Sequence, residues 1–324
     1  MAAWAAAARA DETLRVATWH ADLSRDGPGL LLRDLLADDD PALAAIVGAL
    51  ARVRPDAVLL TDIDYDRGGA ALDAFAKRMR TAGLDYPHHF QVRPNTGRDT
   101  GADVNRDGRL GTARDAQGWG RFAGEGGLAL LSRWPVAADA AVDVSDMLWR
   151  DLPDTLIAAN DPAHDVQRLS TSAHWAVPVE MRGRRVTLMA FHATPPVFDG
   201  PEDRNGRRNA DEIRLWQAWL NGALGHPSPA LPFVLMGNAN LDPLRGEGRR
   251  AAIRDLLADP RLVDPLPGRA TVDWSRLDLG DMRVSYVLPS ADLSVRDAGV
   301  VQVPEAGEHR LVWVDVALSD EPEG

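Results

Sequence analysis

Short apolar runs alternate with amphipathic segments along most of this chain, and this alternation predicts a mixed α/β structure. Apolar residues recur at helical spacing in segments 41–53, 70–82 and 209–224, which we expect to be helices. The runs between them are short, and in one of them Trp175, Val177 and Val179 alternate with other residues, as on a strand. The expected strands cover residues 14–19, 57–60, 89–92, 128–132, 174–179, 186–191, 233–236, 284–288, 293–298 and 311–318.

The order of these elements predicts two stacked sheets. It mixes single crossovers with hairpins, so a sheet of purely parallel strands is not expected. We predict a four-layer α/β/β/α sandwich, in which two mixed sheets pack together and helices flank them. No internal repeat or low-complexity linker divides the chain, and residues 11–324 are therefore expected to form a single domain.

Composition limits the chemistry that this chain can perform. Its 324 residues are 45% hydrophobic, which is enough for a substantial core. The absence of cysteine excludes disulfides, thiolate metal sites and cysteine nucleophiles. A net charge of -12 repels polyanions, so a small phosphate ester or a lipid headgroup is a better substrate class than nucleic acid. No apolar run approaches the length of a bilayer span.

Residues 1–10 are rich in alanine and end in Ala8-Arg9-Ala10, which resembles the end of a secretory signal with its cleavage site. The apolar part is short and lacks a basic start. Two interpretations therefore stay open, a remnant of a signal peptide or a helical leader that frays. The first predicts an extracytoplasmic protein, periplasmic or secreted, and the second a cytoplasmic one. We expect a monomer in either case.

The segment 236–243, Met-Gly-Asn-Ala-Asn-Leu-Asp-Pro, is the most informative stretch of the sequence. A buried apolar run ends there and presents the amides of Asn238 and Asn240 close to the carboxylate of Asp242. Polar side chains gathered at the end of a buried strand are typical of an active site. Taken alone, the two amides also fit a turn that closes the strand.

Several segments in order make the chain similar to the endonuclease/exonuclease/phosphatase family. They are Ala-Thr-Trp-His-Ala-Asp at 17–22, Pro-Asp-Ala-Val-Leu-Leu-Thr-Asp at 55–62, Gly-Leu-Ala-Leu-Leu-Ser-Arg-Trp-Pro at 127–135, Phe-His at 191–192, Arg-Val-Ser-Tyr-Val-Leu at 283–288 and Glu-His-Arg at 308–310. Segment 236–243 resembles the family's Gly-Asp-x-Asn, and the resemblance spans roughly residues 14–318. It implies a DNase I-like fold and hydrolysis of a phosphodiester or phosphomonoester with Mg²⁺ or Mn²⁺.

The resemblance also assigns roles to residues of this chain. The implied catalytic group comprises His192, His309, Asn238, Asn240 and Ser285, and His20 is expected to contact the substrate. The implied metal ligands are Asp62, Glu308 and Asp22, since Mg²⁺ and Mn²⁺ prefer hard oxygen ligands. In such a site the cation neutralises phosphate oxygens, while protein donors stabilise the charge that develops.

Two acids of the family pattern are missing. Asn238 stands where an aspartate usually orients or deprotonates the attacking water, and an amide cannot accept that proton. Ser285 stands where a carboxylate usually orients a catalytic histidine, and His20 replaces an asparagine. Loss of a general base typically costs a factor of about a hundred to ten thousand in rate. The alternative hypothesis is therefore an inactive family member that serves as a binding or scaffolding protein.

The segment 93–127 is longer than loops of compact domains usually are without a function or an ion to order them. Within it Asp103, Asn105 and Asp107, followed by glycine, match the first half of a calcium-binding loop. The twelfth position is Arg114 instead of an acid. A structural Ca²⁺ in the 103–115 loop and a solvated turn both fit this pattern.

Two arginines that follow His192 are candidates for substrate binding. Arg204 and Arg208 lie in a charged segment, and guanidinium groups are well suited to receive a phosphate. The alternative is the solvated, charged start of a helix.

Overall fold

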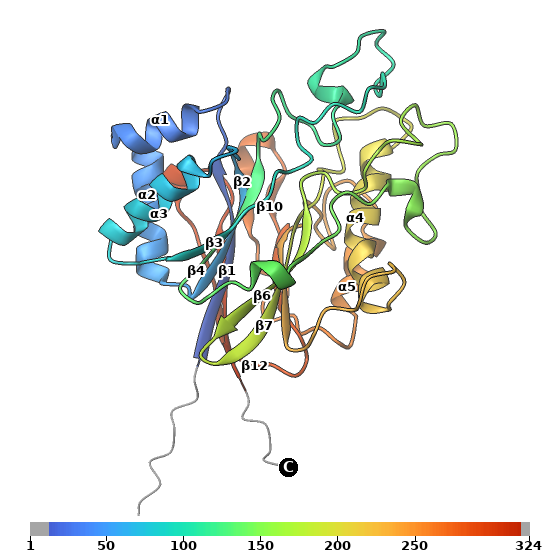
Figure 1. The fold of residues 1–324 in the computed structure, drawn as a ribbon. Coiled ribbons are helices and arrows are strands. Elements are labelled where there is room, and N and C mark those ends of the chain that lie inside the picture. Colours follow the sequence, from blue (N-terminus) through green and yellow to red (C-terminus); the bar gives the residue numbers. More distant parts are fainter. Residues whose placement is uncertain (1–12, 319–324) are drawn as a thin grey trace, which may run out of the picture.

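The structure is a computed structural model that describes residues 13–318. Two β-sheets pack face to face at its centre, and helices cover the outer face of each (Figure 1). The four-layer sandwich predicted from the sequence is therefore present. The prediction for residues 1–10, a signal remnant or a leader, lies outside the described residues.

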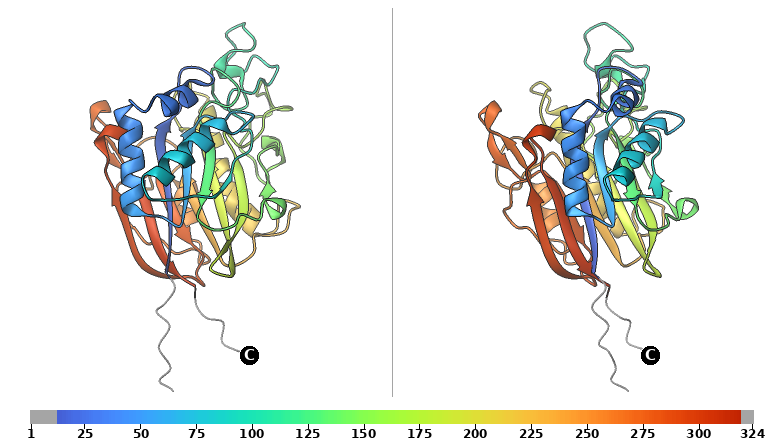
Figure 2. Two further views of the ribbon diagram at one scale, coloured as in Figure 1. Left: turned by 60° about the vertical axis from the view of Figure 1, so that its left-hand side comes forward. Right: turned by 90° about the vertical axis from the view of Figure 1, so that its left-hand side faces the viewer.

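The first sheet has the strand order β12-β13-β1-β2-β4-β3. Its strands are β1 (Thr13–Leu23), β2 (Ala57–Ile63), β3 (His88–Phe90), β4 (Gly127–Ser132), β12 (Ser294–Val301) and β13 (Leu311–Ala317). Strands β1 and β2 are parallel, and the other neighbours pair antiparallel. Helices α1 (Leu30–Ala37), α2 (Pro41–Val53) and α3 (Ala70–Thr81) cover its outer face (Figure 2).

The second sheet has the order β11-β8-β7-β6-β5. Its strands are β5 (Val142–Asp143), β6 (His174–Met181), β7 (Arg184–His192), β8 (Phe233–Asn238) and β11 (Ser285–Pro289). Strands β7 and β8 are parallel and are joined by α4 (Arg204–Leu220), which covers the outer face together with α5 (Ala251–Leu257). A separate hairpin consists of β9 (Val272–Trp274) and β10 (Gly280–Met282).

The central strands of both sheets, such as β2, β4 and β8, are buried on both faces, which explains their almost continuous apolar runs. On β1, Leu14 and Val16 lie in the core between the sheets, whereas Ala17 and Trp19 pack against the helices. Side chains alternate in this way along each strand, so the polar residues beyond the apolar run continue the same two rows. The space between the sheets is thus closed at its end by polar side chains.

The helices and short strands differ from the expected ones in detail. Helix α4 begins at Arg204, five residues before the predicted start at Asn209, and ends at Leu220. Its first turn is polar because ion pairs and hydrogen bonds bury it, so the apolar periodicity begins only later. Helices α1 and α5, with 8 and 7 residues, are too short for a clear periodic pattern, and they were not predicted.

The segment 93–127 folds back on itself in close contact. A Cβ on Gly97 would lie 1.8 Å from the carbonyl oxygen of Phe122, so only glycine allows this approach. The buried carboxylate of Asp115 accepts hydrogen bonds from the backbone of Val104 at 2.9 Å and of Thr112 at 3.0 Å. Protein contacts therefore order the base of this long segment.

Candidate active site

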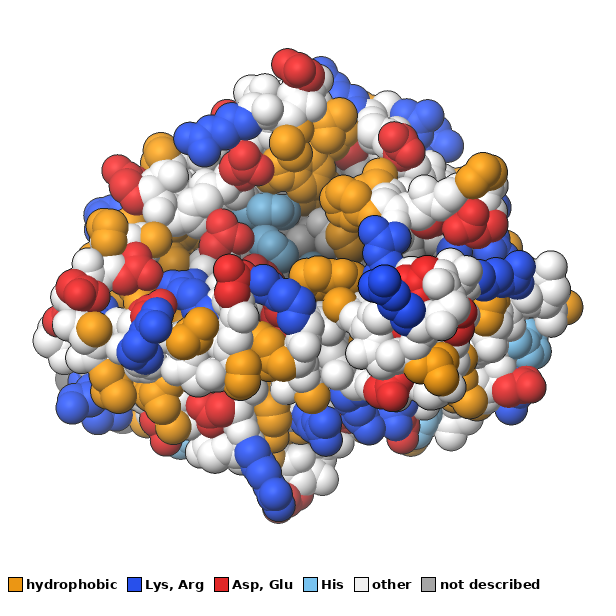
Figure 3. Space-filling model, turned by 90° about the horizontal axis from the view of Figure 1, so that it is seen from above, with side chains coloured by type: hydrophobic (Ala, Val, Ile, Leu, Met, Phe, Trp, Pro, Cys, Tyr) orange, Lys and Arg blue, Asp and Glu red, His pale blue; other side chains and the backbone are white. Residues whose placement is uncertain are grey.

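The carboxyl ends of the two parallel strand pairs meet at one end of the sandwich. His20 on β1 continues the row of Leu14 and Val16 that faces the opposite sheet, and His192 and Asn238 end β7 and β8 in the same space. His20 and His192 border a cavity of about 1270 Å³, which Figure 3 shows as a hollow with histidines at its centre, and Asn238 lies behind them. The sheet register thus brings together residues that are up to 218 positions apart.

Three histidine rings form the floor of this cavity. The His20 ring lies between the other two, with its centroid 5.1 Å from that of His192 and 4.2 Å from that of His309. Burial lowers the pKa of His20 to about 4. Burial, and then the neighbouring imidazoles, hold the pKa of His192 and His309 well below the ordinary value. All three are therefore neutral at pH 7, and each offers one N–H donor and one acceptor nitrogen.

Two amides connect the histidines. The Oδ1 of Asn238 accepts from the backbone N–H of Asn240 at 3.0 Å, and its Nδ2 lies 3.1 Å from Asn240 Oδ1 and 3.3 Å from His20 Nδ1. The Nδ2 of Asn240 donates to the Ala193 carbonyl at 2.9 Å and lies 3.3 Å from His192 Nε2. These contacts hold an uncharged polar wall where the family resemblance places an acid.

Several buried polar atoms around this wall have no hydrogen-bond partner. Ser285 lies directly opposite Asn238 in the antiparallel register of β11 and β8, so the two side chains share one face. Within residues 13–318, Ser285 Oγ, His309 Nδ1 and His192 Nδ1 are all buried without a partner. No protein acceptor therefore fixes which nitrogen of His309 carries the proton.

His20, Asp22 and Asp62 form a group that could bind a metal ion. Their ligand atoms all lie within 4.8 Å of one another, and His20 Nε2 is 3.8 Å from Asp62 Oδ2. Burial, and then the charge of Glu125, raise the pKa of Asp62 to about 6. The two aspartates adopt positive φ values of 46° and 60°, a backbone conformation that side-chain-bearing residues rarely take.

Asp22 stands at the outer side of this group. Burial, and then the charges of Asp62 and Glu308, raise its pKa to about 6. Its side chain is exposed and faces these two carboxylates. Excess negative charge of this kind is relieved by a divalent cation.

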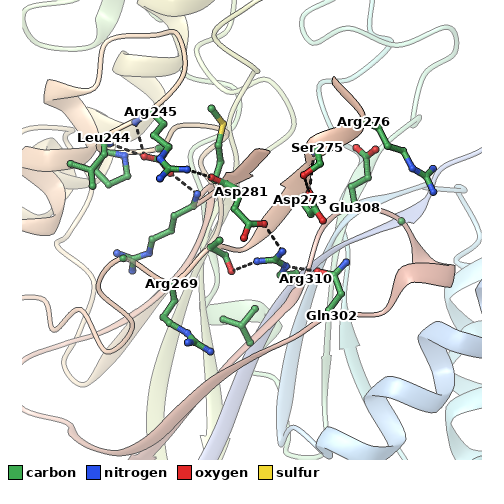
Figure 4. A pocket seen from close by; sticks show the side chains of 18 of the residues that line it. Leu244, Arg245, Arg269, Asp273, Ser275, Arg276, Asp281, Gln302, Glu308 and Arg310 are labelled. Carbon is green, nitrogen blue, oxygen red and sulfur yellow. Dashed lines mark hydrogen bonds and ion pairs between the residues drawn. The ribbon is translucent and has the colours of Figure 1, made fainter. Parts of the chain in front are cut away.

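Glu308 was also predicted to be a metal ligand. Among the described residues, it does not belong to the group formed by His20, Asp22 and Asp62. It borders a neighbouring cavity of about 910 Å³ together with Asp273, Arg276 and Arg310, and Figure 4 shows it among these side chains. The two cavities share Asp242 among their lining residues. The charge of Glu308 still acts on Asp22, so it contributes to the field of the metal group from the second cavity.

The two predicted substrate-binding arginines border the cavity, but the fold already engages them. Arg204 contacts both carboxylate oxygens of Asp161, at 2.8 and 3.3 Å, and donates to Gln167 at 2.8 Å. Arg208 is buried, and its guanidinium donates to the carbonyls of Leu169 and Arg168 at 2.9 Å. A phosphate contact by either residue stays a prediction.

The residues of the predicted calcium loop lie close together at an exposed turn. The carboxylate of Asp103 accepts from the backbone N–H groups of Asp107 at 3.0 Å and Gly108 at 2.8 Å. The Nδ2 of Asn105 donates to Asp107 at 3.0 Å. The acid next to the twelfth position, Asp115, points instead into the base of the loop. Calcium binding stays a prediction.

Sequence reasoning missed several residues of this region. Thr61, whose Oγ lies 3.2 Å from His20 Nδ1, and Glu125, which acts on Asp62, reach the site only through the sheet pairing. The exposed apolar side chains of Phe198, Leu277 and Leu279, with exposed fractions of 82%, 61% and 51%, also border the cavity. Phe198 lies between β7 and α4, whereas Leu277 and Leu279 lie in the connection between β9 and β10, so no sequence pattern links the two positions. None of the helices formed by residues 13–318 has the length and apolar character of a bilayer span.

Comparisons with known proteins agree with the fold. A model of the endonuclease/exonuclease/phosphatase family matches residues 29–320. The crystal structure of an endonuclease/exonuclease/phosphatase from Beutenbergia cavernae DSM 12333 is similar at 21% identity and a TM-score of 0.60, covering 96% of this chain and 73% of that one. A search of curated proteins found no match.

Two further solved structures share the fold over almost their whole length. A family protein from Leptotrichia buccalis C-1013-b has 14% identity and a TM-score of 0.56, and the match covers 94% of this chain and 100% of that one. Sphingomyelinase C from Streptomyces griseocarneus has 18% identity and a TM-score of 0.52, with coverage of 95% and 100%. The predicted family resemblance and DNase I-like fold are thereby confirmed.

Proposed function

Because this chain belongs to the endonuclease/exonuclease/phosphatase family, we propose that it is a divalent-metal-dependent phosphoesterase that hydrolyses a phosphodiester or a phosphomonoester. The observation that carries the proposal is the group of His20, Asp22 and Asp62, of which His20 and Asp62 border the same cavity as two neutral histidines, His192 and His309. A cation site next to uncharged N–H donors suits a substrate that carries negative charge on its reacting group.

The residues divide the work of such a reaction between two walls of the cavity. Asp22 and Asp62 would hold a Mg²⁺ or Mn²⁺ ion, which when bound neutralises charge on the phosphate oxygens. On the other wall, His192 and His309 would donate N–H groups to the same phosphate. Their neutrality matters because a neutral imidazole donates without the cost of a buried charge. Asn240, fixed by three hydrogen-bond contacts, would orient the phosphate or the water.

The weak point of this mechanism is removal of the proton from the attacking water. Asn238 cannot accept it, and Ser285 offers no negative charge to orient His192 or His309. We therefore expect slow hydrolysis. The second candidate function, a binding or scaffolding protein, rests on these same two positions.

The surroundings of the cavity favour a small phosphate ester or a lipid headgroup over nucleic acid. The net charge of -12 opposes a polyanion. The exposed apolar residues Phe198, Leu277 and Leu279 at the border of the cavity suit the non-polar part of an amphiphilic ester. An extracytoplasmic location and a monomeric state remain predictions.

Hydrolysis of bis(p-nitrophenyl) phosphate and p-nitrophenyl phosphate with Mg²⁺, Mn²⁺ or Ca²⁺ tests the proposal. We expect slow turnover that EDTA and His192→Ala abolish. The double change Asn238→Asp and Ser285→Asp should raise the rate by a factor of about a hundred or more. Turnover by the double variant alone would support the binding-protein alternative. No turnover by any variant, despite a folded and metal-loaded protein, would refute the phosphoesterase proposal.

A further inference from the structure

The metal group contains an imidazole among its three ligands, and this changes which ion fits it. Carboxylates and water suit Mg²⁺, Ca²⁺ and Mn²⁺, whereas imidazole suits Zn²⁺ and other transition ions. His20 provides the nitrogen, and Asp22 and Asp62 provide the oxygens. The family resemblance instead expects asparagine at position 20. The substitution therefore exchanges a neutral oxygen-bearing side chain for a stronger nitrogen donor.

The distances within the group fit a common ion. Zinc bonds of about 2.0–2.2 Å place neighbouring ligand atoms about 3–4 Å apart. The separation of 3.8 Å between His20 Nε2 and Asp62 Oδ2 falls within this range. All ligand atoms of the group lie within 4.8 Å of one another, so only a small movement of Asp22, which is exposed, is required.

Contacts on its other sides restrict the His20 ring. It packs between His309 and His192, with interplanar angles of 42° and 73°, and only 15% of its side chain is exposed. The Oγ of Thr61, 3.2 Å from Nδ1, can accept a hydrogen bond from a protonated Nδ1, whereas the donor Nδ2 of Asn238, 3.3 Å from the same atom, favours the other tautomer, so an ion on Nε2 would select the form with the proton on Nδ1. With the proton on Nδ1, the lone pair of Nε2 lies on the side of Asp62 and can bind an ion. A hydrogen-bond acceptor beside the other ring nitrogen is typical of metal-binding histidines.

The other histidines of the floor do not complete a three-histidine site. In the described chain, no ligand atoms of His192 or His309 lie within the group formed by His20, Asp22 and Asp62. Three protein ligands of mixed N and O type leave coordination positions open for water and substrate, as in catalytic zinc sites.

We propose that His20 is an inner-sphere metal ligand and that the site binds Zn²⁺ through this nitrogen in preference to Mg²⁺ and Ca²⁺. The inference rests on the proposed function only in placing the ion at the catalytic cavity. It assigns His20 to the metal and leaves phosphate contacts to His192 and His309.

Metal binding by the full-length protein, stripped of metal beforehand, tests this assignment without any substrate. Titration calorimetry with ZnCl₂, MnCl₂, MgCl₂ and CaCl₂ should give a Zn²⁺ affinity at least about a hundredfold above that for Mg²⁺. His20→Asn should lower Zn²⁺ affinity about tenfold or more and leave Mg²⁺ affinity within about threefold. His226→Asn, at an exposed position outside the site, is the matched control and should change neither.

A spectroscopic measurement on the unchanged protein makes the test independent of how the variants fold. Electron spin echo modulation of the Mn²⁺-loaded protein should show coupling to an imidazole ¹⁴N, and this coupling should disappear in His20→Asn. Absence of the coupling in the unchanged chain, or its persistence in the variant, would overturn the assignment. Equal Zn²⁺ affinities of the unchanged chain and His20→Asn would do the same.

These outcomes are separable from those of the hydrolysis assay. Nitrogen coordination by His20 without any turnover would support the ligand assignment and refute the proposed function. Turnover with Mg²⁺ in a protein that lacks the nitrogen coupling would support the function and refute the assignment.

Discussion

The substitution Asp62→Asn should make the metal-free protein more stable while it removes metal binding. Burial, followed by the charge of Glu125, raises the pKa of Asp62 from 3.8 to about 6, and the side chain is 24% exposed. Ionisation is therefore less favourable in the folded state than in the unfolded state. At about 1.36 kcal/mol per pKa unit, the ionised carboxylate costs about 3 kcal/mol of stability at pH 7.5.

The sign of this effect fixes its pH dependence. A raised folded-state pKa means that the contribution of Asp62 to stability is fully present below its unfolded pKa of 3.8 and is lost as the pH rises through about 6. The gain from Asp62→Asn should accordingly shrink from about 3 kcal/mol at pH 7.5 to about 1 kcal/mol at pH 4.5.

Urea unfolding in EDTA at these two pH values measures the difference directly. Asp139→Asn removes the same charge from an exposed position and should show no such pH-dependent gain. Addition of Zn²⁺ or Mn²⁺ at about a hundred times its Kd should stabilise the unchanged chain by about 2.7 kcal/mol and leave Asp62→Asn unaffected. A variant less stable than the unchanged chain in EDTA at pH 7.5 would refute the reasoning, as would a gain that stays constant with pH.

Three further predictions concern the histidines, the arginines and the mouth of the cavity. Ser285→Asp should raise the pKa of His309, whose Nδ1 has no partner, whereas Ser285→Ala should leave it unchanged; NMR titration of the imidazole resonances decides between these outcomes. Arg208→Met should lower the free energy of unfolding by about 2 kcal/mol or more, because a buried guanidinium loses its carbonyl partners, and an equally stable variant with a raised KM would indicate substrate binding instead. The double change Leu277→Ser and Leu279→Ser should weaken turnover of a phosphodiester lipid in vesicles while it leaves p-nitrophenyl esters unaffected, and equal losses on both substrates would contradict a lipid-facing role.

The location of the site could be predicted from the sequence because strand ends carry the information. The apolar row of β1 stops before His20, and that of β8 stops at Asn238. In parallel pairs such as β1 with β2 and β7 with β8, the carboxyl ends lie on the same side of the sheet. A polar residue after each buried run is thus placed at one end of the sandwich by the pleat alone.

The environments of Glu308, Arg204 and Arg208 could not be predicted in the same way. Glu308 precedes β13 in an irregular segment, where no periodicity fixes the direction of a side chain, and it turns into the second cavity. A polar first turn of a helix has the same sequence pattern whether water or buried partners satisfy it. In α4 the partners are Asp161 and the carbonyl of Leu169, which are brought there by the loop before β6. Such long-range contacts are not encoded by local pattern.

The three departures from the family pattern lie together in space, and this changes their meaning. Ser285 faces Asn238 across the β11–β8 pair, and Asn238 Nδ2 lies 3.3 Å from His20 Nδ1. All three side chains are uncharged at pH 7, since burial keeps His20 neutral. Within the group that contains His20, negative charge is therefore carried by Asp22 and Asp62 alone.

A cavity with this division of charge favours anion binding over proton abstraction. Carboxylates at the positions of Asn238 and Ser285 would repel a substrate that carries its own negative charge. The neutral side chains of Asn238 and Ser285 avoid that repulsion. The same replacement removes the strongest available base. We therefore expect phosphate analogues to bind more tightly to the unchanged chain than to the variant with Asn238→Asp and Ser285→Asp, even as that variant turns over faster. The test is to measure the Kd of a phosphate analogue and the kcat for hydrolysis in both proteins. A double variant that binds the analogue more tightly and also turns over faster would show that loss of the two acids does not increase phosphate affinity.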